Sequence, residues 1–340
     1  MHSELKIKSK NKEYCVVFVD NLDFVENEID QPNTITFIDS NVACLYPSLG
    51  ENKTSVYCIN CVENVKTLSG VIDIFNCMIA SKANARTKLI VIGGGILQDL
   101  VGFCASTYCR GIDYVLVPTT LLAQADSCIG GKTSINFQDK KNIVGSFYPP
   151  YKIIIYPDFT DTLTNLDFIS GLGEIYKFHI LQNNIEEFVY DQNIQKLIYN
   201  GLKYKSHIIE IDEYDRAERK MLNFGHTFGH AFESVSEYEV PHGVAVILGS
   251  IVAIMISKNL GYHVDKYEAI IEAGMRLLRE TNIQFRKEWF DYEKLNNVIK
   301  FDKKSTGKLT MVLFDAKPVI VDVEKIDMMQ PILDNLYESI

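Results

Sequence analysis

The sequence predicts an α/β domain built on a parallel-type sheet, followed by a mostly α-helical domain. Two observations predict this fold class. The first half of the chain holds short, β-branched runs that are apolar throughout, which is typical of strands covered on both faces. After about residue 157 the segments show helical spacing with few β-branched runs. We therefore expect an α/β domain at 1–160, a helical domain at 161–340 and a ligand site in the cleft between them.

The expected elements follow in chain order. Strands are expected at residues 14–20, 34–40, 55–60, 88–95, 114–120 and 152–158, with helices at 62–81 and 98–108. This alternation of strand and helix indicates an open α/β layer. Helices are then expected at 167–182, 184–209, 214–236, 242–260 and 265–281, and a β pair at 309–315 and 318–323.

Composition excludes several classes of protein. A net charge of −10 argues against a nucleic-acid binder, which needs a basic surface. The longest nearly apolar run, 243–256, is shorter than the roughly 20 residues of a membrane span, and the first residues lack an apolar signal core. Eight cysteines, all before residue 129, indicate free thiols in a reducing cytoplasm. Cys58 and Cys61 form one CxxC without a second pair, so we expect small buried side chains rather than a zinc site.

A glycine turn follows the expected strand at 88–95. The segment KLIVIGGGILQD runs from an apolar strand through Gly93, Gly94 and Gly95 towards a helix, whose first N–H groups could face a phosphate. Gln98 stands where the GxGxxG fingerprint has its last glycine, so the usual dinucleotide motif is absent. The turn is either a nucleotide site or a tight strand–helix corner. Thr119 and Thr120 end the next strand and could add ligand contacts.

A basic, glycine-marked loop is expected at 126–149. Its Gly-Gly-Lys-Thr at 130–133 resembles half of a P-loop, but Asp126 stands where that motif needs its first glycine, which excludes a P-loop NTPase. Lys132, Lys140, Lys141 and Asn142 could bind an anion, or the loop could simply be solvated.

Three of the seven histidines lie within 17 residues. His226 and His230 are four apart and share a helix face, but Thr227 replaces the glutamate of a zinc-protease HExxH. His226, His242 and one carboxylate would make a three-ligand zinc site with an open position, and Glu174 is the candidate carboxylate. The alternatives are core histidines and an ordinary ion pair between Glu174 and Lys177. His179, in the same apolar stretch, is expected to be structural.

Several blocks in this order resemble the 3-dehydroquinate synthase family and the wider sugar-phosphate cyclases. The blocks are GGGILQDLVGF, RGIDYVLVPTTLLAQADSCIGGKTSIN, KKNIVGSFYPP, GLGEIYKF and NFGHTFGHAFE with PHG. The resemblance runs from about Asp39 to the end of the sequence. It implies NAD in the first domain, zinc or cobalt in the cleft, and a homodimer.

By match to the family motifs, Glu174, His226 and His242 resemble the metal ligands. The positions that resemble NAD contacts are Asp39, Glu63, Lys66, Gly94, Gly95, Asp99, Thr119, Thr120, Lys132, Lys141 and Thr162. The positions that resemble the substrate site are Asp126, Lys132, Lys141, Asn142, Lys177, Lys205, Arg219, Asn223, His230 and Lys304 of a late Asp-Lys-Lys element. Arg110 resembles a residue that reaches the neighbouring subunit's site.

The resemblance also implies a reaction. The family substrate is a seven-carbon keto acid phosphate of the shikimate pathway, which leads to the aromatic amino acids. NAD transiently oxidises a ring hydroxyl, phosphate leaves, the ketone is reduced, and an aldol step closes the ring of 3-dehydroquinate. Asp126 and Lys177 would orient hydroxyls and help to move protons. Lys132, Asn142, Asn223, His230 and a late lysine would hold phosphate, whereas Lys205 and Arg219 would hold the carboxylate.

Five positions depart from the family pattern: Asp139-Lys140, Thr164, Tyr176, Asp215 and Val244. They leave open a related cyclase that makes a cyclitol or an amino analogue, although Lys205, Arg219 and Asn223 favour the keto acid. A metal-dependent alcohol dehydrogenase and a non-enzymatic descendant are further alternatives.

Overall fold

The computed structural model describes residues 4–10, 12–51, 53–138, 140–190, 193–302, 309–323 and 329–340. The chain forms two compact units, one of Met1–Thr162 with Lys205–Tyr214 and the other of Leu163–Tyr204 with Asp215–Ile340. A parallel-type sheet in the first unit and helices in the second confirm the predicted fold class.

The first unit is built on a seven-stranded sheet with the order β1-β2-β9-β6-β5-β3-β4. Its strands are β1 (Glu4–Ile7), β2 (Tyr14–Phe18), β3 (Thr34–Asp39), β4 (Val56–Ile59), β5 (Lys88–Gly93), β6 (Tyr114–Pro118) and β9 (Lys152–Ile155). All neighbours pair in parallel except β1, which pairs antiparallel with β2. The six predicted strands are confirmed, each a little shorter than expected, and β1 is an addition.

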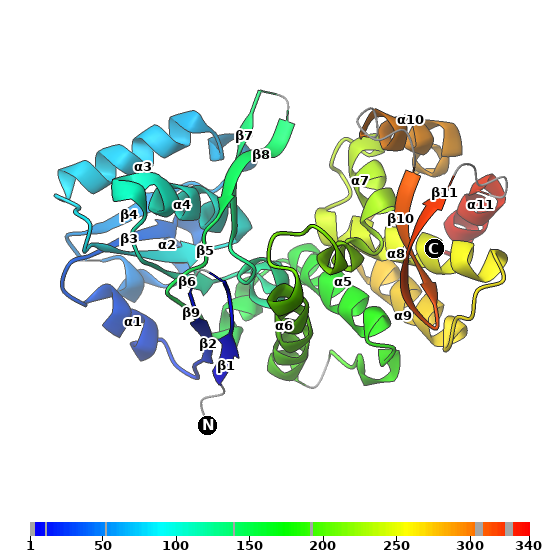
Figure 1. Ribbon diagram of the computed structural model, residues 1–340, viewed down its shortest axis with the longest axis horizontal. Helices are drawn as coiled ribbons and strands as arrows, with labels where there is room; N and C mark the ends of the chain where they lie inside the picture. Colours follow the sequence, from blue (N-terminus) through cyan, green and yellow to red (C-terminus); the bar gives the residue numbers. More distant parts are fainter. Residues whose placement is uncertain are drawn as a thin grey trace. The chain divides into compact units, whose positions relative to one another are not determined.

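Helices cover both faces of this sheet, which is why its central strands are apolar at every position. Ile90 and Ile92 of β5 belong to one core cluster with Val25 and Ile29 of α1 (Asp23–Ile29). Because side chains alternate along a strand, the buried Leu89 and its neighbour Val91 point to the opposite face. Figure 1 shows α1 on one side of the sheet and α3 (Leu68–Ala80) and α4 (Gly95–Thr107) on the other. A short α2 (Ser40–Leu45) follows β3.

The segment predicted as a loop at 126–149 contains a β-hairpin, so that prediction is wrong. Strands β7 (Lys132–Phe137) and β8 (Lys140–Phe147) pair antiparallel, with an irregularity between Ile135 and Phe137. Hydrophobic patterning does not reveal this hairpin, because β8 is mostly exposed and lacks an apolar run. The hairpin instead carries polar side chains that contact α4 and the residues before α3.

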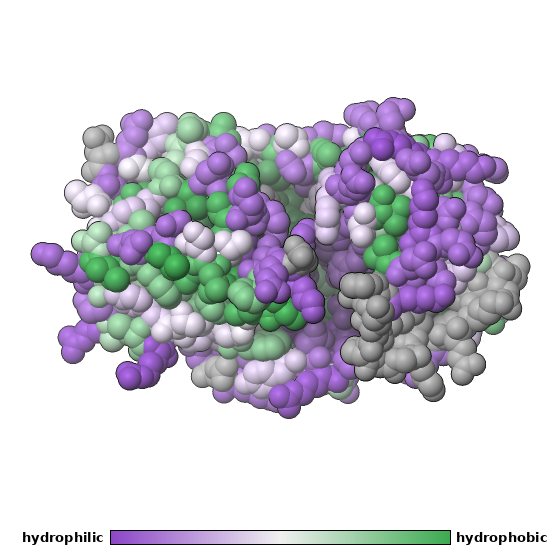
Figure 2. Space-filling model, turned by 90° about the horizontal axis from the view of Figure 1, so that it is seen from above, coloured by the Kyte–Doolittle hydropathy of each residue, from purple (hydrophilic) through white to green (hydrophobic). Residues whose placement is uncertain are grey.

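Part of the first unit's surface is apolar. Leu68, Ile72 and Ile79 are spaced by four and seven residues along α3, so they share one face, and all three are exposed. Figure 2, which views the molecule from above, shows hydrophobic side chains among hydrophilic ones over this unit.

Cys58 is exposed, on β4, so the expectation that both CxxC cysteines are buried is wrong. All eight cysteines are free thiols, as predicted.

The second unit consists mainly of helices. They are α5 (Asn165–Leu181), α6 (Ile194–Ile211), α7 (His226–Val235), α8 (His242–Asn259), α9 (Tyr267–Glu280), α10 (Tyr292–Asp302) and α11 (Met329–Ser339), with a hairpin of β10 (Leu309–Asp315) and β11 (Lys317–Val323). Residues 205–211 of α6 belong to the first unit. Helix α8 has the length and composition of a membrane span, but 83% of it is buried inside the protein, which is typical of a core helix.

The predicted helix at 214–236 is broken. A 3-10 turn at Glu218–Asn223 precedes Gly225, whose φ of 77° is left-handed, and α7 then begins at His226. A Cβ at Gly225 would lie 2.9 Å from the backbone nitrogen of Ser250, so glycine is required there for both conformation and space. The break places His226 in the first turn of α7.

Helices α5 and α8 touch backbone to backbone. A Cβ on Gly173 would overlap the carbonyl of Gly243, and a Cβ on Gly243 would overlap the carbonyl of Ser170. The two glycines therefore permit an approach that no larger residue allows. Glu174 and His242 are their chain neighbours, so this contact brings the carboxylate of α5 to the first residue of α8.

Candidate metal and nucleotide sites

Glu174, His226 and His242 converge in the second unit. The Nε2 atoms of His226 and His242 lie 3.4 and 3.3 Å from Oε1 of Glu174, and the ligand atoms of the three residues all lie within 4.8 Å of one another. Ligands held tetrahedrally at about 2.0 Å from one ion lie about 3.3 Å apart. The spacing and the donor types therefore fit a divalent metal held by three protein ligands.

Both histidines have an acceptor behind the ring. The Nδ1 of His226 lies 3.1 Å from the carbonyl of Phe224, and the Nδ1 of His242 lies 3.2 Å from Oε2 of Glu233. When Nδ1–H donates to such an acceptor, the lone pair is on Nε2, the nitrogen that faces Glu174. The arrangement orients both imidazoles as metal ligands.

The electrostatics of this cluster are dominated by burial and by Lys177. Glu174 and Lys177 form an ion pair, and each side chain is only 2% exposed. Burial raises the pKa of Glu174, but the Lys177 ammonium and the two histidines outweigh it and hold that pKa well below its usual range. Burial lowers the pKa of His242, yet its hydrogen bonds with Glu174 and Glu233 raise it to about 10. The ordinary surface ion pair considered for Glu174 and Lys177 is therefore excluded.

Of the other site candidates in the second unit, His230 lies beside this cluster. The ring of His230, one turn along α7, lies 5.4 Å from the ring of His226 and 5.9 Å from that of His242. Arg219 and Asn223 lie in the 3-10 turn before α7, where Arg219 is buried and Asn223 is exposed. His179 is buried, with Nδ1 3.2 Å from the Asn184 carbonyl, in keeping with the predicted structural role.

The glycine turn of the first unit joins β5 to α4. Gly94 caps the helix and Gly95 is its first residue. A Cβ on Gly94 would lie 3.1 Å from the side chain of Thr120, so the turn fits closely against the end of β6. The Thr119 amide donates to the Gly93 carbonyl at 3.2 Å, which ties the two strand ends together. Helix α4 thus begins where adjacent parallel strands end, a usual place for a nucleotide phosphate.

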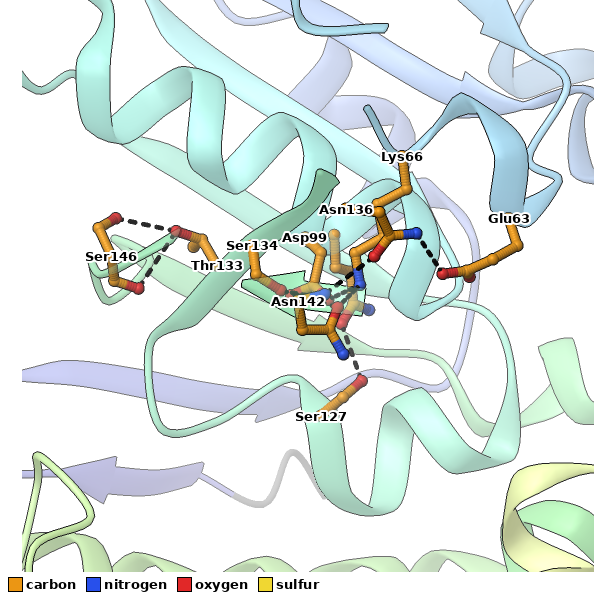
Figure 3. Close-up of polar contacts among 10 residues, drawn as sticks. Glu63, Lys66, Asp99, Ser127, Thr133, Ser134, Asn136, Asn142 and Ser146 are labelled. Atoms are coloured by element: carbon orange, nitrogen blue, oxygen red, sulfur yellow. Dashed lines mark hydrogen bonds and ion pairs between the residues drawn. The ribbon is translucent and has the colours of Figure 1, made fainter. Parts of the chain in front are cut away.

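A polar network joins the hairpin to this region (Figure 3). Lys66 forms an ion pair with Asp99 and donates to Asn142 Oδ1 at 2.5 Å. Asn136 donates to Glu63 at 2.7 Å and accepts the Asn142 amide at 2.9 Å. Burial raises the pKa of Asp99, and Lys66 offsets only part of that shift. The network brings together residues with two expected roles. Glu63, Lys66 and Asp99 are expected to contact NAD, and Asn142 is expected to bind the substrate phosphate.

Asp126 and Lys205 form a second polar centre in this unit. Asp126 lies in a π-helical turn, Ala123–Ser127, and its carboxylate is 3.0 Å from the Lys205 ammonium, which also donates to the Asp126 carbonyl at 2.6 Å. Lys205 and Arg219, which were predicted to share a carboxylate, fall in different units.

The remaining candidates are more dispersed. Lys132 and Lys141 are exposed on the hairpin, and Asp39 ends β3 and caps α2 by accepting the Asn41 amide. Thr162 is exposed and donates to the Phe159 carbonyl at 3.0 Å, and Arg110 is exposed with a φ of 67°. Lys304 lies outside the described residues.

Sequence reasoning missed Glu233 and the Phe224 carbonyl. A backbone acceptor leaves no sequence signal. Glu233 did leave one, because positions 226, 230 and 233 are spaced by four and three residues and so share one face of α7.

The chain is similar to known proteins over most of its length. The family models for the N-terminal and C-terminal parts of 3-dehydroquinate synthase match residues 56–170 and 171–305. A relative from Clostridium tetani, named 3-dehydroquinate synthase, is 34% identical over 99% of this chain and 95% of its own. One of the same name from Alkaliphilus metalliredigens is 38% identical over 77% of this chain and 76% of its own. A solved 2-deoxy-scyllo-inosose synthase, complexed with carbaglucose-6-phosphate, NAD+ and Co2+, is 23% identical with a TM-score of 0.83, covering 98% of this chain and 100% of that one.

Proposed function

Since this chain belongs to the 3-dehydroquinate synthase family, we propose that it converts 3-deoxy-arabino-heptulosonate 7-phosphate into 3-dehydroquinate and inorganic phosphate. It would act in the cytoplasm as a carbon–oxygen lyase that eliminates phosphate and closes a carbocycle. The observation that carries the proposal is the convergence of Glu174, His226 and His242 at the spacing of one tetrahedral ion, in a chain of this family.

The metal would be held by these three residues, and zinc or cobalt fits their nitrogen and oxygen donors. Once bound, it would supply Lewis-acid polarisation of substrate oxygens. The Lys177 ammonium, buried against Glu174, is a proton carrier held in one place. We assign to Lys177 the orientation of a substrate hydroxyl and the handling of its proton.

NAD would be held by the first unit, with its phosphates at the N-terminus of α4. The unpaired N–H groups of the first helical turn and the close backbone at Gly94 and Gly95 support this placement. When bound, NAD would supply reversible hydride chemistry, so no net redox change is expected. The further contacts we propose are Asp39, Glu63, Lys66, Asp99, Thr119, Thr120, Lys132, Lys141 and Thr162.

The substrate is anionic at both ends, and the proposed residues provide cations for both. Arg219 and Lys205 would bind the carboxylate. Because Lys205 already pairs with Asp126 at 3.0 Å, Asp126 would hold the ammonium in place while orienting a hydroxyl itself. The phosphate would be bound by Lys132, Asn142, Asn223, His230 and Lys304. We propose that residues of both units act on one substrate.

We also propose that the active form is a homodimer, in which Arg110 reaches the neighbouring site. Arg110 is two residues after Tyr108, whose ring packs at 5.8 Å against Phe75 of α3. The exposed apolar face of α3 therefore belongs to the same part of the first unit, which supports association there. Light scattering should give twice the chain mass, and a monomeric mass in the active protein would contradict this part of the proposal.

The proposal is tested by product analysis. The protein, given the keto acid phosphate with NAD and zinc, should release phosphate and form dehydroquinate in equal amounts, with no net NADH absorbance. His242→Ala should be inactive, whereas His263→Ala is the matched control because His263 is an exposed histidine paired with Asp265. Phosphate release with a different cyclic product would indicate a sister cyclase. Stoichiometric NADH would indicate an alcohol dehydrogenase.

A further inference from the structure

We propose that Glu233 is a positioning residue that fixes which nitrogen of His242 faces the metal. The inference rests on the proposed function, because it assumes that Glu174, His226 and His242 hold a divalent ion. Glu233 is on α7, its side chain is 15% exposed, and its Oε2 lies 3.2 Å from Nδ1 of His242. On the other side of the same ring, Nε2 lies 3.3 Å from Glu174.

The two nitrogens of His242 cannot both use a lone pair. A neutral imidazole has one N–H and one lone pair, and only the lone pair can bind a metal. Glu174 and Glu233 can both accept a hydrogen bond from this ring, but once Glu174 holds an ion only Glu233 still accepts, so Glu233 selects the form that carries the proton on Nδ1. The lone pair is then on Nε2, which faces Glu174 and His226.

A second set of possible metal ligands also includes His242. His230, Glu233 and His242 also offer ligand atoms within 4.8 Å of one another, so they form a second candidate metal trio. Both trios use His242, but the second one would need its Nδ1 lone pair. As long as Nδ1–H donates to Glu233, the second trio lacks a ligand and the ion is directed to Glu174.

The two histidine ligands differ in how their orientation is secured. His226 donates to a backbone carbonyl, which no side-chain substitution removes. His242 depends on one carboxylate, so its orientation can be tested by mutation. Outer partners of metal-bound histidines are worth about 10–100-fold in metal affinity.

The test is cobalt binding to Glu233→Gln, measured by chelator competition and by the visible spectrum of the bound ion. The glutamine amide has no charge and can either accept from or donate to Nδ1, so it no longer selects one form of the ring. We expect cobalt to bind about 10–100-fold more weakly, with an altered spectrum. Glu237→Gln is the matched control, since it removes the same charge at an exposed position just beyond the end of α7, and it should bind cobalt as the unchanged protein does.

The outcomes separate this inference from the function on which it rests. If Glu233→Gln binds cobalt as tightly as the unchanged protein while His226→Ala does not bind it, the role of Glu233 is refuted and the metal site stands. If His226→Ala also keeps its cobalt, the metal site itself is refuted. Should Glu233→Gln fail to fold, the nitrogen resonances of His242 in the unchanged, zinc-loaded protein decide, because binding through Nδ1 would overturn the inference.

Discussion

Replacing Lys177 with methionine should destabilise the protein strongly when no divalent metal is bound. Methionine fills much of the same space, but it leaves the Glu174 carboxylate without its main counter-charge at a position that is 2% exposed. Removing one partner of a buried ion pair costs about 3–5 kcal/mol. Urea unfolding of chelator-treated protein at pH 7 measures the loss. Lys196→Met, on the exposed side of α6, is the control and should cost less than about 0.5 kcal/mol.

The dependence of this loss on pH has a definite sign. The pKa of folded Glu174 is held well below the ordinary value of 4.5, so its contribution to stability is present above that value and is lost as pH falls towards the lowered pKa. In the variant that pKa rises because burial remains and the ammonium is gone. The difference between the two proteins should therefore be largest near pH 7 and should shrink below about pH 4.5.

Metal should rescue the Lys177→Met variant, because a divalent ion on Glu174 replaces the missing positive charge. Saturating zinc should narrow the difference in unfolding free energy from the unchanged protein. The reasoning is refuted if Lys177→Met costs no more than Lys196→Met in the chelated state. The reasoning is also refuted if saturating zinc leaves the difference in unfolding free energy between the variant and the unchanged protein as it was.

Three further outcomes are expected. The pKa of His242 is raised to about 10, so a metal ion must displace its proton to bind. Zinc affinity, measured by calorimetry, should therefore rise about tenfold per pH unit between about pH 7 and 9. An affinity that does not change with pH would contradict this. Gly243→Ala should lower the free energy of unfolding by about 1–3 kcal/mol or more and should weaken zinc binding, because the new methyl group overlaps the Ser170 carbonyl. Thermal unfolding measures the first effect. A variant with unchanged stability and zinc affinity would refute the close helix contact. Lys66→Met should weaken NAD binding, measured by calorimetry. Lys88 is a half-buried lysine of the same unit, and Lys88→Met should leave NAD binding unchanged. Equal effects of the two substitutions would argue against the proposed nucleotide contact.

The fold was predictable where hydrophobicity decides the structure. The strands around β5 are buried on both faces and read as continuous apolar runs, and α8 is apolar over 14 residues because it is a core helix. The hairpin of β7 and β8 was missed because polar contacts, not burial, place it. The break before α7 was missed because a left-handed glycine such as Gly225 has the same sequence signal as a helical one.

The site was predictable to the extent that residue type reveals it. Histidines are rare in this chain, so their clustering was visible, and Glu174 stood out as a carboxylate in an apolar stretch. Glu233 was overlooked, although its spacing places it on the same face of α7 as His226 and His230, because a glutamate on a helix usually faces solvent. The contact between Lys66 and Asn142 could not be foreseen, since it joins residues 76 apart through a hairpin that the sequence did not reveal.

The most direct test of the central claim is the metal content of single variants. The unchanged protein, dialysed after loading with zinc, should retain one ion per chain, whereas Glu174→Gln, His226→Ala and His242→Ala should each lose it while keeping their fold by circular dichroism. If all three folded variants still hold one zinc ion per chain, these side chains do not form the metal site. The proposed reaction would then lack the metal ion on which it depends.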